Sequence, residues 1–151
     1  MPQQGPATRE RWRIKPFPAQ REALPFEARF EGEEVQRLQQ GLVPQDVEDK
    51  WFIFYEEGWL YLHRAITGSC IYALRLRIEG EVAEVTEAWV NAHPGEYTAT
   101  DRAWDAALLG FLVHDLLAGR PQDFPVRTTL PEDKQLNFQH TVVGRRRRSW
   151  E

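Results

Sequence analysis

Several features that would assign this chain to a familiar class of protein are missing from its sequence. Cys70 is its only cysteine, so a single chain can build neither a disulfide framework nor a zinc site from several cysteine ligands. Gly-rich phosphate loops, a GxSxG elbow, a CxxC pair and an HExxH motif are all absent. The formal net charge of -4 argues against a surface coated in positive charge for nucleic acid or acidic lipid. We therefore expect no bound metal and no cofactor.

The sequence also has no apolar run of membrane-spanning length, and its first residues, MPQQGPATRERWRIKP, lack the apolar segment of a signal peptide. These absences and the single cysteine predict a cytoplasmic protein with no membrane partner. At 151 residues, 42% of them hydrophobic and 28% charged, the chain has the size and composition of one folded domain. We expect a flexible N-terminal tail over residues 1–11, a single domain over 12–144 and a basic C-terminal tail over 145–151.

Strand-type residues between turn signals predict an antiparallel meander. We expect its four strands at residues 50–55, 59–64, 70–78 and 81–90, with tight turns at Glu56-Glu57-Gly58 and Glu79-Gly80. Two weaker strand signals lie outside the meander. Residues 26–30 alternate and suggest a short strand, and residues 141–144 suggest an edge strand.

Two helices are expected around this meander. Residues 33–40 predict a short helix, because acidic residues lie in its first turn and Gly41 follows its end. A long helix is expected to begin at a cap among Thr98, Thr100 and Asp101 and to end near Ala118. The predicted fold is α+β: a four-stranded antiparallel meander covered on one face by a long C-terminal helix and a short N-terminal helix, with irregular terminal arms.

The alternation of side chains sorts the first hairpin into two faces. With a three-residue loop at 56–58, one face is expected to hold Trp51, Ile53, Tyr55, Trp59, Tyr61 and His63. The other face then holds Phe52, Phe54, Leu60 and Leu62 and is expected to be the core under the long helix. A two-residue turn at 79–80 places Arg77 opposite Val82 and Arg75 opposite Glu84, away from that core.

The first of these faces is the leading candidate for function. Its predicted ligand-binding residues are Trp51, Tyr55, Trp59, Tyr61, His63, Arg75 and Arg77. Planar rings stack on bases or sugars, and guanidinium groups pair with phosphate or carboxylate. The pattern favours a non-enzymatic cytoplasmic binding or regulatory module that holds a nucleotide, a nucleic-acid strand or a protein partner. Two alternatives stay open: the face is a second core layer under the terminal arms, with Trp12, Phe17, Phe124 and Phe138, or it is a homodimer interface.

An enzyme is a further alternative. His63 and Arg64 lie near Thr67, Ser69 and Cys70, and the loop of His93, Glu96 and Tyr97 leaves the fourth predicted strand, so a phosphate- or nucleotide-directed enzyme can be imagined. His63, Arg64, His93 and Glu96 are therefore weak catalytic candidates. His63 and Arg64 point to opposite faces of one strand, and no nearby carboxylate orients the imidazole. Cys70 is expected to be a small core residue.

The hairpin also resembles a known pattern. The string DKWFIFYEEGWLYLHRAITG is similar to a hairpin of small bacterial proteins without an assigned activity, which runs W-F-x-Y-x-E-x-x-W-L-Y-x-H-R-S-x-T-G. Ala65 stands where that pattern has Ser. The resemblance covers little more than the hairpin; it implies a bacterial origin and a recurrent domain, and it carries over no catalytic residue. The four arginines of Arg145–Arg148 are expected to attract phosphate only as a solvated charge run.

Overall fold

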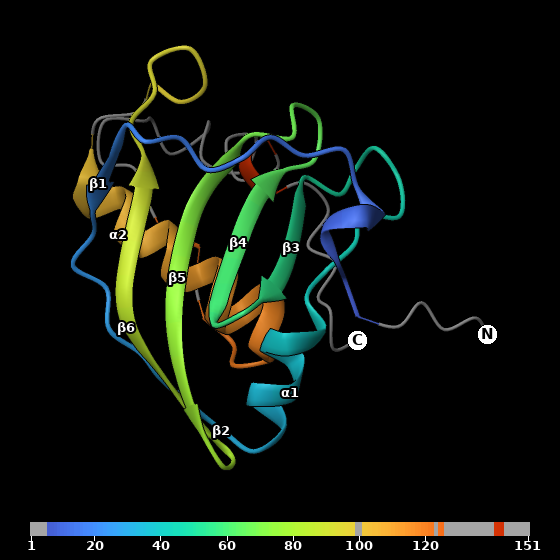
Figure 1. Ribbon diagram of the computed structural model, residues 1–151, viewed down its shortest axis with the longest axis vertical. Helices are drawn as coiled ribbons and strands as arrows, with labels where there is room; N and C mark the ends of the chain where they lie inside the picture. Colours follow the sequence, from blue (N-terminus) through green and yellow to red (C-terminus); the bar gives the residue numbers. More distant parts are fainter. Residues whose placement is uncertain (1–5, 99–100, 123, 126–140, 144–151) are drawn as a thin grey trace.

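The computed structural model describes residues 6–98, 101–122, 124–125 and 141–143, and it has one sheet with a different cover on each face (Figure 1). Its strands, all antiparallel to their neighbours, are β1 (Arg21–Ala23), β2 (Arg29–Glu31), β3 (Trp51–Glu56), β4 (Trp59–Arg64), β5 (Cys70–Glu79) and β6 (Val82–Asn91). The predicted meander is present as β3 to β6. The α+β class is confirmed, but the sheet has six strands and not four.

The two additional strands lie along the outer side of β6. The order across the sheet is β1-β6-β5-β4-β3, and β2 pairs with the opposite end of β6 from β1. Each has three residues, too few to give a readable alternation, and β2 only overlaps the strand suggested at 26–30. At the other edge of the sheet, Leu42 forms a two-hydrogen-bond bridge with Ile53 of β3.

The register of the first hairpin differs by one residue from the prediction. Glu56 pairs with Trp59, so the loop is Glu57-Gly58, and both loop residues have positive φ, 52° and 88°. Two such residues are typical of a type I′ turn, whose twist suits a hairpin. Phe52 consequently lies opposite His63, and Phe54 opposite Tyr61. A one-residue slip moves every side chain of a strand to the other face.

The predicted faces are therefore wrong for β3 and right for β4. Trp51, Ile53 and Tyr55 lie with Leu60 and Leu62 in or against the core under the helices. Phe52 and Phe54 belong with Tyr61 to a second apolar cluster on the opposite face. The second hairpin is shifted as well. Arg77 pairs with Glu84 and Arg75 with Glu87, although both arginines are exposed, away from the core as expected.

The helices cover the first of these faces. α1 (Glu33–Gln40) has the predicted bounds, and Asp101 caps α2 (Arg102–Gly110) by accepting a 3.1 Å hydrogen bond from the backbone N–H of Trp104. The long helix then continues to Ala118 as a π-helical segment, η2 (Phe111–Ala118). Residues 141–143 are helical, so the edge strand predicted there is wrong. No helix among the described residues is long and apolar enough to cross a membrane.

The opposite face, over β3 and β4, is covered by residues 6–20, which we call the N-terminal arm; it crosses in front of the sheet in Figure 1. Ala7 is buried and donates its backbone N–H to Gln40, and Arg9–Arg11 forms a short 3-10 turn, η1. Trp12 stacks on Phe52 with ring centroids 6.0 Å apart. The residues predicted as a flexible tail are thus described from residue 6 onward, and here they pack on the sheet. The basic tail 145–151, Phe138 and Thr100 lie outside the described residues.

Candidate functional site

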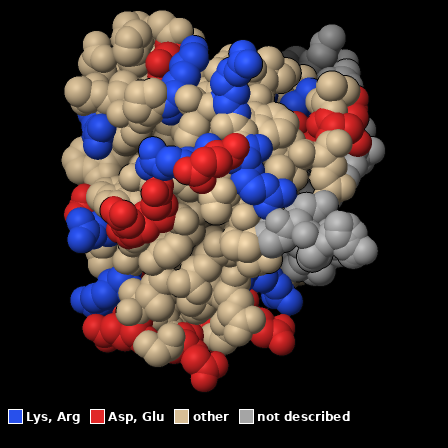
Figure 2. All heavy atoms as spheres, turned by 45° about the vertical axis from the view of Figure 1, so that its right-hand side comes forward, with Lys and Arg blue, Asp and Glu red and all other residues tan. Residues whose placement is uncertain are grey.

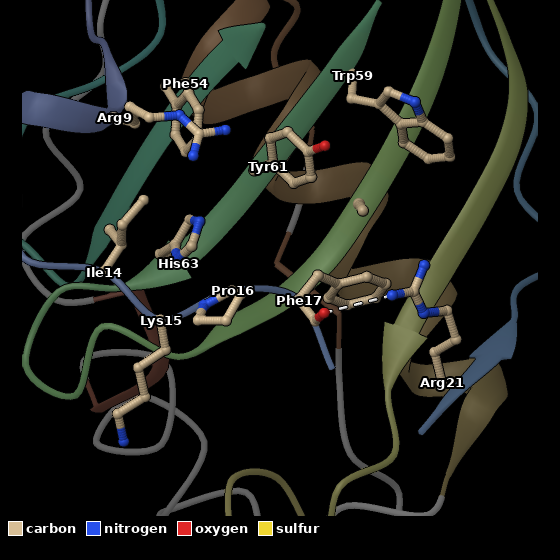
Figure 3. Close-up of a pocket in the computed structure, with 11 residues that line it drawn as sticks. Arg9, Ile14, Lys15, Pro16, Phe17, Arg21, Phe54, Trp59, Tyr61 and His63 are labelled. Atoms are coloured by element: carbon tan, nitrogen blue, oxygen red, sulfur yellow. Dashed lines mark hydrogen bonds between the residues drawn. The ribbon is translucent and has the colours of Figure 1, made fainter. Parts of the chain in front are cut away.

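A cavity of about 260 Å³ lies between the N-terminal arm and the face formed by β3, β4 and β5 (Figure 3). We call it the arm cavity. β3, β4 and β5 supply five of its lining residues: Phe54, Trp59, Tyr61, His63 and Ala73. The arm and β1 supply the other six: Arg9, Ile14, Lys15, Pro16, Phe17 and Arg21. Ala73 pairs with Tyr61 on one side and Trp89 on the other, so a methyl group lies between two large rings. The small side chain leaves room where a larger one would fill the cavity.

The strand side of the cavity is a row of rings. Trp59 and Tyr61 alternate along β4 and are nearly parallel, with centroids 6.4 Å apart and an angle of 22°. Tyr61 also packs against Phe54 at 5.2 Å. Trp59 and Tyr61 remain half-exposed, whereas Phe54 is buried. Ring faces at this spacing can stack on a planar ligand, because every base or aryl ring presents a π face.

His63 continues this row and is held in one tautomer. Its Nδ1 lies 2.8 Å from the carbonyl oxygen of Gly68, and since a carbonyl only accepts, Nδ1 carries the proton. Burial lowers the pKa of the imidazole, and Arg9 adds to this, against the opposing effect of the Gly68 hydrogen bond. His63 is therefore neutral at pH 7. Its Nε2 is an acceptor, with no partner among the described residues.

Two guanidinium groups beside the cavity lack a carboxylate partner within the described part of the chain. Arg21 donates to the carbonyl oxygens of Pro18 and Phe17 at 2.8 and 3.3 Å and stacks on the Phe17 ring at 4.4 Å, which fixes its position. Arg75 lies over Trp59 at 5.6 Å, next to the cavity and not lining it. Arg9, in contrast, is engaged by Glu56. Figure 3 shows the Lys15 side chain extending away from the rings.

The polar groups that remain available define what the cavity can bind. No aspartate or glutamate is among its described lining residues. The hydroxyl of Tyr61 has no hydrogen-bond partner in the described structure, and burial raises its pKa, so it stays protonated and can donate. A donor, a neutral acceptor and a stacked guanidinium around aromatic rings suit a small flat ligand that carries negative charge.

The structure places only part of the predicted ligand face at this cavity. Trp59, Tyr61 and His63 line it, and Arg75 flanks it. Trp51 is buried on the helix side, where it stacks on Tyr72, and Tyr55 packs against the same core. Arg77 lies away from the cavity in an ion pair with Glu84. The positions of Trp51 and Tyr55 follow from the register of the first hairpin. Arg77 lies two residues beyond Arg75, which pairs with Trp59 at the start of β4.

The candidate catalytic residues are not brought together. His63 lines the arm cavity, whereas Arg64 and Glu96 line a different cavity on the helix side of the sheet. His93 lines neither, and its Nδ1 accepts a hydrogen bond from the backbone N–H of Gly95 at 2.9 Å. Cys70 is buried, and that burial raises the pKa of its thiol above the usual range. This thiol is therefore protonated and has the environment of a core residue.

The sequence reasoning missed the arm's share of the site. Phe17 and Arg21 lie in and just after a Pro-rich segment without periodicity, and nothing local predicts that they face β4. A spacing of four residues brings side chains together in a helix, but Pro16 and Pro18 argue against a helix here, so this spacing did not predict the stacked pair. Ala73 does carry a local signal. It is a small residue between Tyr72 and Leu74 in a predicted strand, and a small side chain between large ones leaves space on the sheet face.

Comparison of the chain with protein-family models, curated proteins and solved structures finds no match in any of the three. The bacterial origin implied by the hairpin pattern stays a prediction. Within the described residues, no group of three or more His, Cys, Asp or Glu side chains is arranged to hold a metal ion.

Proposed function

We propose that this protein is a binding module whose arm cavity holds a mononucleotide or a similarly small anion with a flat ring. The ring stacks against Trp59 and Tyr61, and the phosphate or carboxylate group pairs with Arg21 at the arm and with Arg75 at the rim. The observation that carries the proposal is the stacked, carboxylate-free Arg21 beside a row of aromatic rings.

Charge and chemistry support this ligand class. A guanidinium held by backbone carbonyls retains free N–H groups for an anion, and its rigid position lowers the entropic cost of binding. Nε2 of His63 accepts a hydrogen bond, and the Tyr61 hydroxyl donates one, so a base with an exocyclic amino group and a ring nitrogen matches both. The absence of acidic residues from the described lining removes the main source of repulsion.

Size favours a small ligand over a strand of nucleic acid. A cavity of about 260 Å³ lies just below the usual range of ligand sites, roughly 300 to 1,000 Å³, and accommodates one base with part of its substituents. Figure 2 shows basic and acidic side chains interspersed over the visible face of the molecule, without a continuous basic track. A polyanion would meet repulsion along such a surface, because strand binding depends on a positively charged groove.

The homodimer alternative has less support. Of the rings on this face, Phe52, Phe54 and His63 are buried in the monomer, under a cover that includes Trp12 and Ile14. Little contiguous aromatic surface remains for a second copy, and stable dimers bury large apolar areas.

The test is calorimetric titration with AMP, GMP, CMP and UMP, together with adenosine and inorganic phosphate. We expect at least one nucleotide to bind with one-to-one stoichiometry. Its nucleoside and free phosphate should each bind roughly tenfold or more weakly, because each lacks one half of the interaction. Absence of saturable binding by every nucleotide would contradict the proposal.

Two variants locate the binding. Ala73→Leu fills the cavity and should abolish nucleotide binding, and Arg21→Gln should weaken it by about tenfold while leaving nucleoside binding unchanged. Arg77→Gln is the matched control, since Arg77 is an exposed arginine of the same sheet face that pairs with Glu84. An affinity unchanged by Ala73→Leu, in a variant with the circular dichroism spectrum of the parent, would place the ligand elsewhere.

A further inference from the structure

A second cavity, of about 370 Å³, lies on the helix side of the sheet, at the end of β3 and β4 where Trp51 and Arg64 are located. We call it the helix-side cavity. Apolar and aromatic side chains form most of its described lining, and Arg64 and Glu96 are its only charged members: Trp51, Arg64, Thr67, Ile71, Tyr72, Glu96, Tyr97, Trp104, Leu108, Thr141 and Val142. This lining, with one cationic and one anionic side chain in an apolar wall, differs from the lining of the arm cavity.

Arg64 is held in position without a carboxylate. Its guanidinium lies over the Trp51 ring at 5.1 Å and donates to the backbone carbonyls of Val142 and Thr141. No acidic residue in the described ranges forms an ion pair with it. Burial lowers its pKa, although an arginine stays charged at neutral pH. Since a guanidinium has five N–H donors and two are engaged, three remain for an acceptor.

Glu96 is likewise oriented by a neutral group. The side-chain amide of Asn91, which is fully buried, donates to Oε1 of Glu96 at 2.9 Å and to the carbonyl of Cys70 at 2.8 Å. Glu96 has no ion-pair partner within the described part of the chain, and it does not pair with Arg64 although both line the same cavity. Its Oε2 is therefore available to a donor. The two charged groups thus have separate anchors, backbone carbonyls for Arg64 and the Asn91 side chain for Glu96.

The two tyrosine hydroxyls at the wall are already engaged. Tyr72 and Tyr97 both donate to Oδ1 of the buried Asp105, at 2.7 and 2.5 Å, and Arg102 donates to Oδ2 at 2.9 Å. This carboxylate thus has a full set of donors and does not compete for a ligand. The rings of both tyrosines remain as apolar wall. Polar recognition in the cavity is left to Arg64 and Glu96, with the exposed Thr67 hydroxyl beside them.

From this arrangement we infer that the helix-side cavity binds a free amino acid with an apolar side chain. The α-carboxylate pairs with Arg64, the α-ammonium group pairs with Glu96, and the side chain lies among Ile71, Trp104 and Leu108. A zwitterion satisfies both charges at once, whereas a simple anion would leave Glu96 unpaired and a simple cation would leave Arg64 unpaired. The volume suits a side chain such as that of leucine or phenylalanine.

This inference is independent of the proposed function, because the arm cavity and the helix-side cavity share no lining residue. Calorimetric titration with L-leucine and L-phenylalanine is the first measurement. Isocaproate and 3-phenylpropionate, which lack the ammonium group, and isoamylamine and phenethylamine, which lack the carboxylate, are the comparison ligands. We expect an amino acid to bind roughly tenfold or more tightly than either truncated ligand. Equal or tighter binding of a truncated ligand, or no binding of either amino acid, overturns the inference.

Variants assign the two charges. Glu96→Gln keeps the acceptor for Asn91 and should weaken amino-acid binding by about tenfold without changing 3-phenylpropionate binding. Arg64→Lys retains a charge but loses the planar fork, and it should weaken the binding of both amino acids and of 3-phenylpropionate. Glu57→Gln, at the far end of the same hairpin, is the matched control and should change nothing. Arg21→Gln, in the arm cavity, should leave amino-acid binding intact, and a Glu96→Gln protein with unaltered affinity overturns the inference.

Discussion

One face of the sheet is covered by α1, α2 and η2, whereas the opposite face is covered over β3 and β4 by an arm with a single 3-10 turn. The helix face buries a large apolar cluster; on the arm face only Ala7, Phe52 and Phe54 are buried in the second cluster. The arm is fastened at separate points, such as Trp12 Nε1 to the carbonyl of Ala65 and Lys15 N–H to the carbonyl of Gly68. Burial of apolar surface is the main source of stability, so the helices should contribute more to the free energy of unfolding than the arm does.

The largest expected effect compares one residue from each cover. Leu62→Ala removes a fully buried leucine of the helix face and should lower the free energy of unfolding by roughly 2 to 5 kcal/mol. Trp12→Ala removes a half-buried ring of the arm, and its cost should be smaller, roughly 1 to 2 kcal/mol. Urea unfolding followed by circular dichroism measures both. If the two losses are equal, the arm is as strong a cover as the helices.

A smaller effect is expected where the arm meets the β4–β5 turn. Gly68 has φ 78°, and a Cβ there would lie 2.6 Å from the carbonyl oxygen of Arg13. Gly68→Ala should therefore cost roughly 1 to 3 kcal/mol and speed amide hydrogen exchange in the arm. Gly80→Ala is the control, since Gly80 has φ 62° but an added Cβ meets nothing within 4 Å. Similar losses in both variants would mean that only backbone conformation matters and that Arg13 is not in tight contact.

The smallest effect concerns pH and involves one histidine on each side of the sheet. Burial lowers the pKa of His63 under the arm and of His114 in η2. The unfolded chain then takes up protons below about pH 6.5 while the folded chain does not, so stability is full above pH 6.5 and falls as the pH drops toward the lowered folded values. Each histidine contributes at most about 1.4 kcal/mol per pH unit. Urea unfolding at pH 7.5 and 5.5 should show a smaller loss of unfolding free energy in His63→Gln than in the parent protein. If the two losses are identical, His63 is not a source of the pH dependence.

Local signals predicted the elements of the fold well. The bounds of α1 and β4 follow from acidic residues in the first turn of the helix, Gly41 after it, and turn residues on both sides of the strand. The order of the meander follows from short connections, which favour antiparallel neighbours. β1 was missed and β2 was only overlapped by the strand suggested at residues 26–30, because the pairing of both with β6 depends on contacts far along the chain. No periodicity in the sequence predicts a π-helical segment.

The candidate site was predicted only in part, for one physical reason in the first hairpin and another in the N-terminal arm. Glu57 adopts positive φ, a conformation that sequence reasoning reserved for Gly58, so the loop was given one residue too many. That single residue exchanged Trp51 and Tyr55 for Phe52 and Phe54 on the candidate face. Arg21 and Phe17 reach the cavity through the path of the arm, which is set by tertiary packing and not by local pattern.

Leu42 beside β3 has a consequence for the behaviour of the protein at high concentration. Exposed strand edges invite pairing with other molecules, which leads to aggregation. Here both hydrogen-bonding groups of Ile53, in the middle of the edge strand, are engaged by Leu42. The opposite edge is divided between β1 and β2, each of three residues, which is a short template for a foreign strand. The bridge at Leu42 and the two short strands thus reduce the length of open edge that another molecule could pair with.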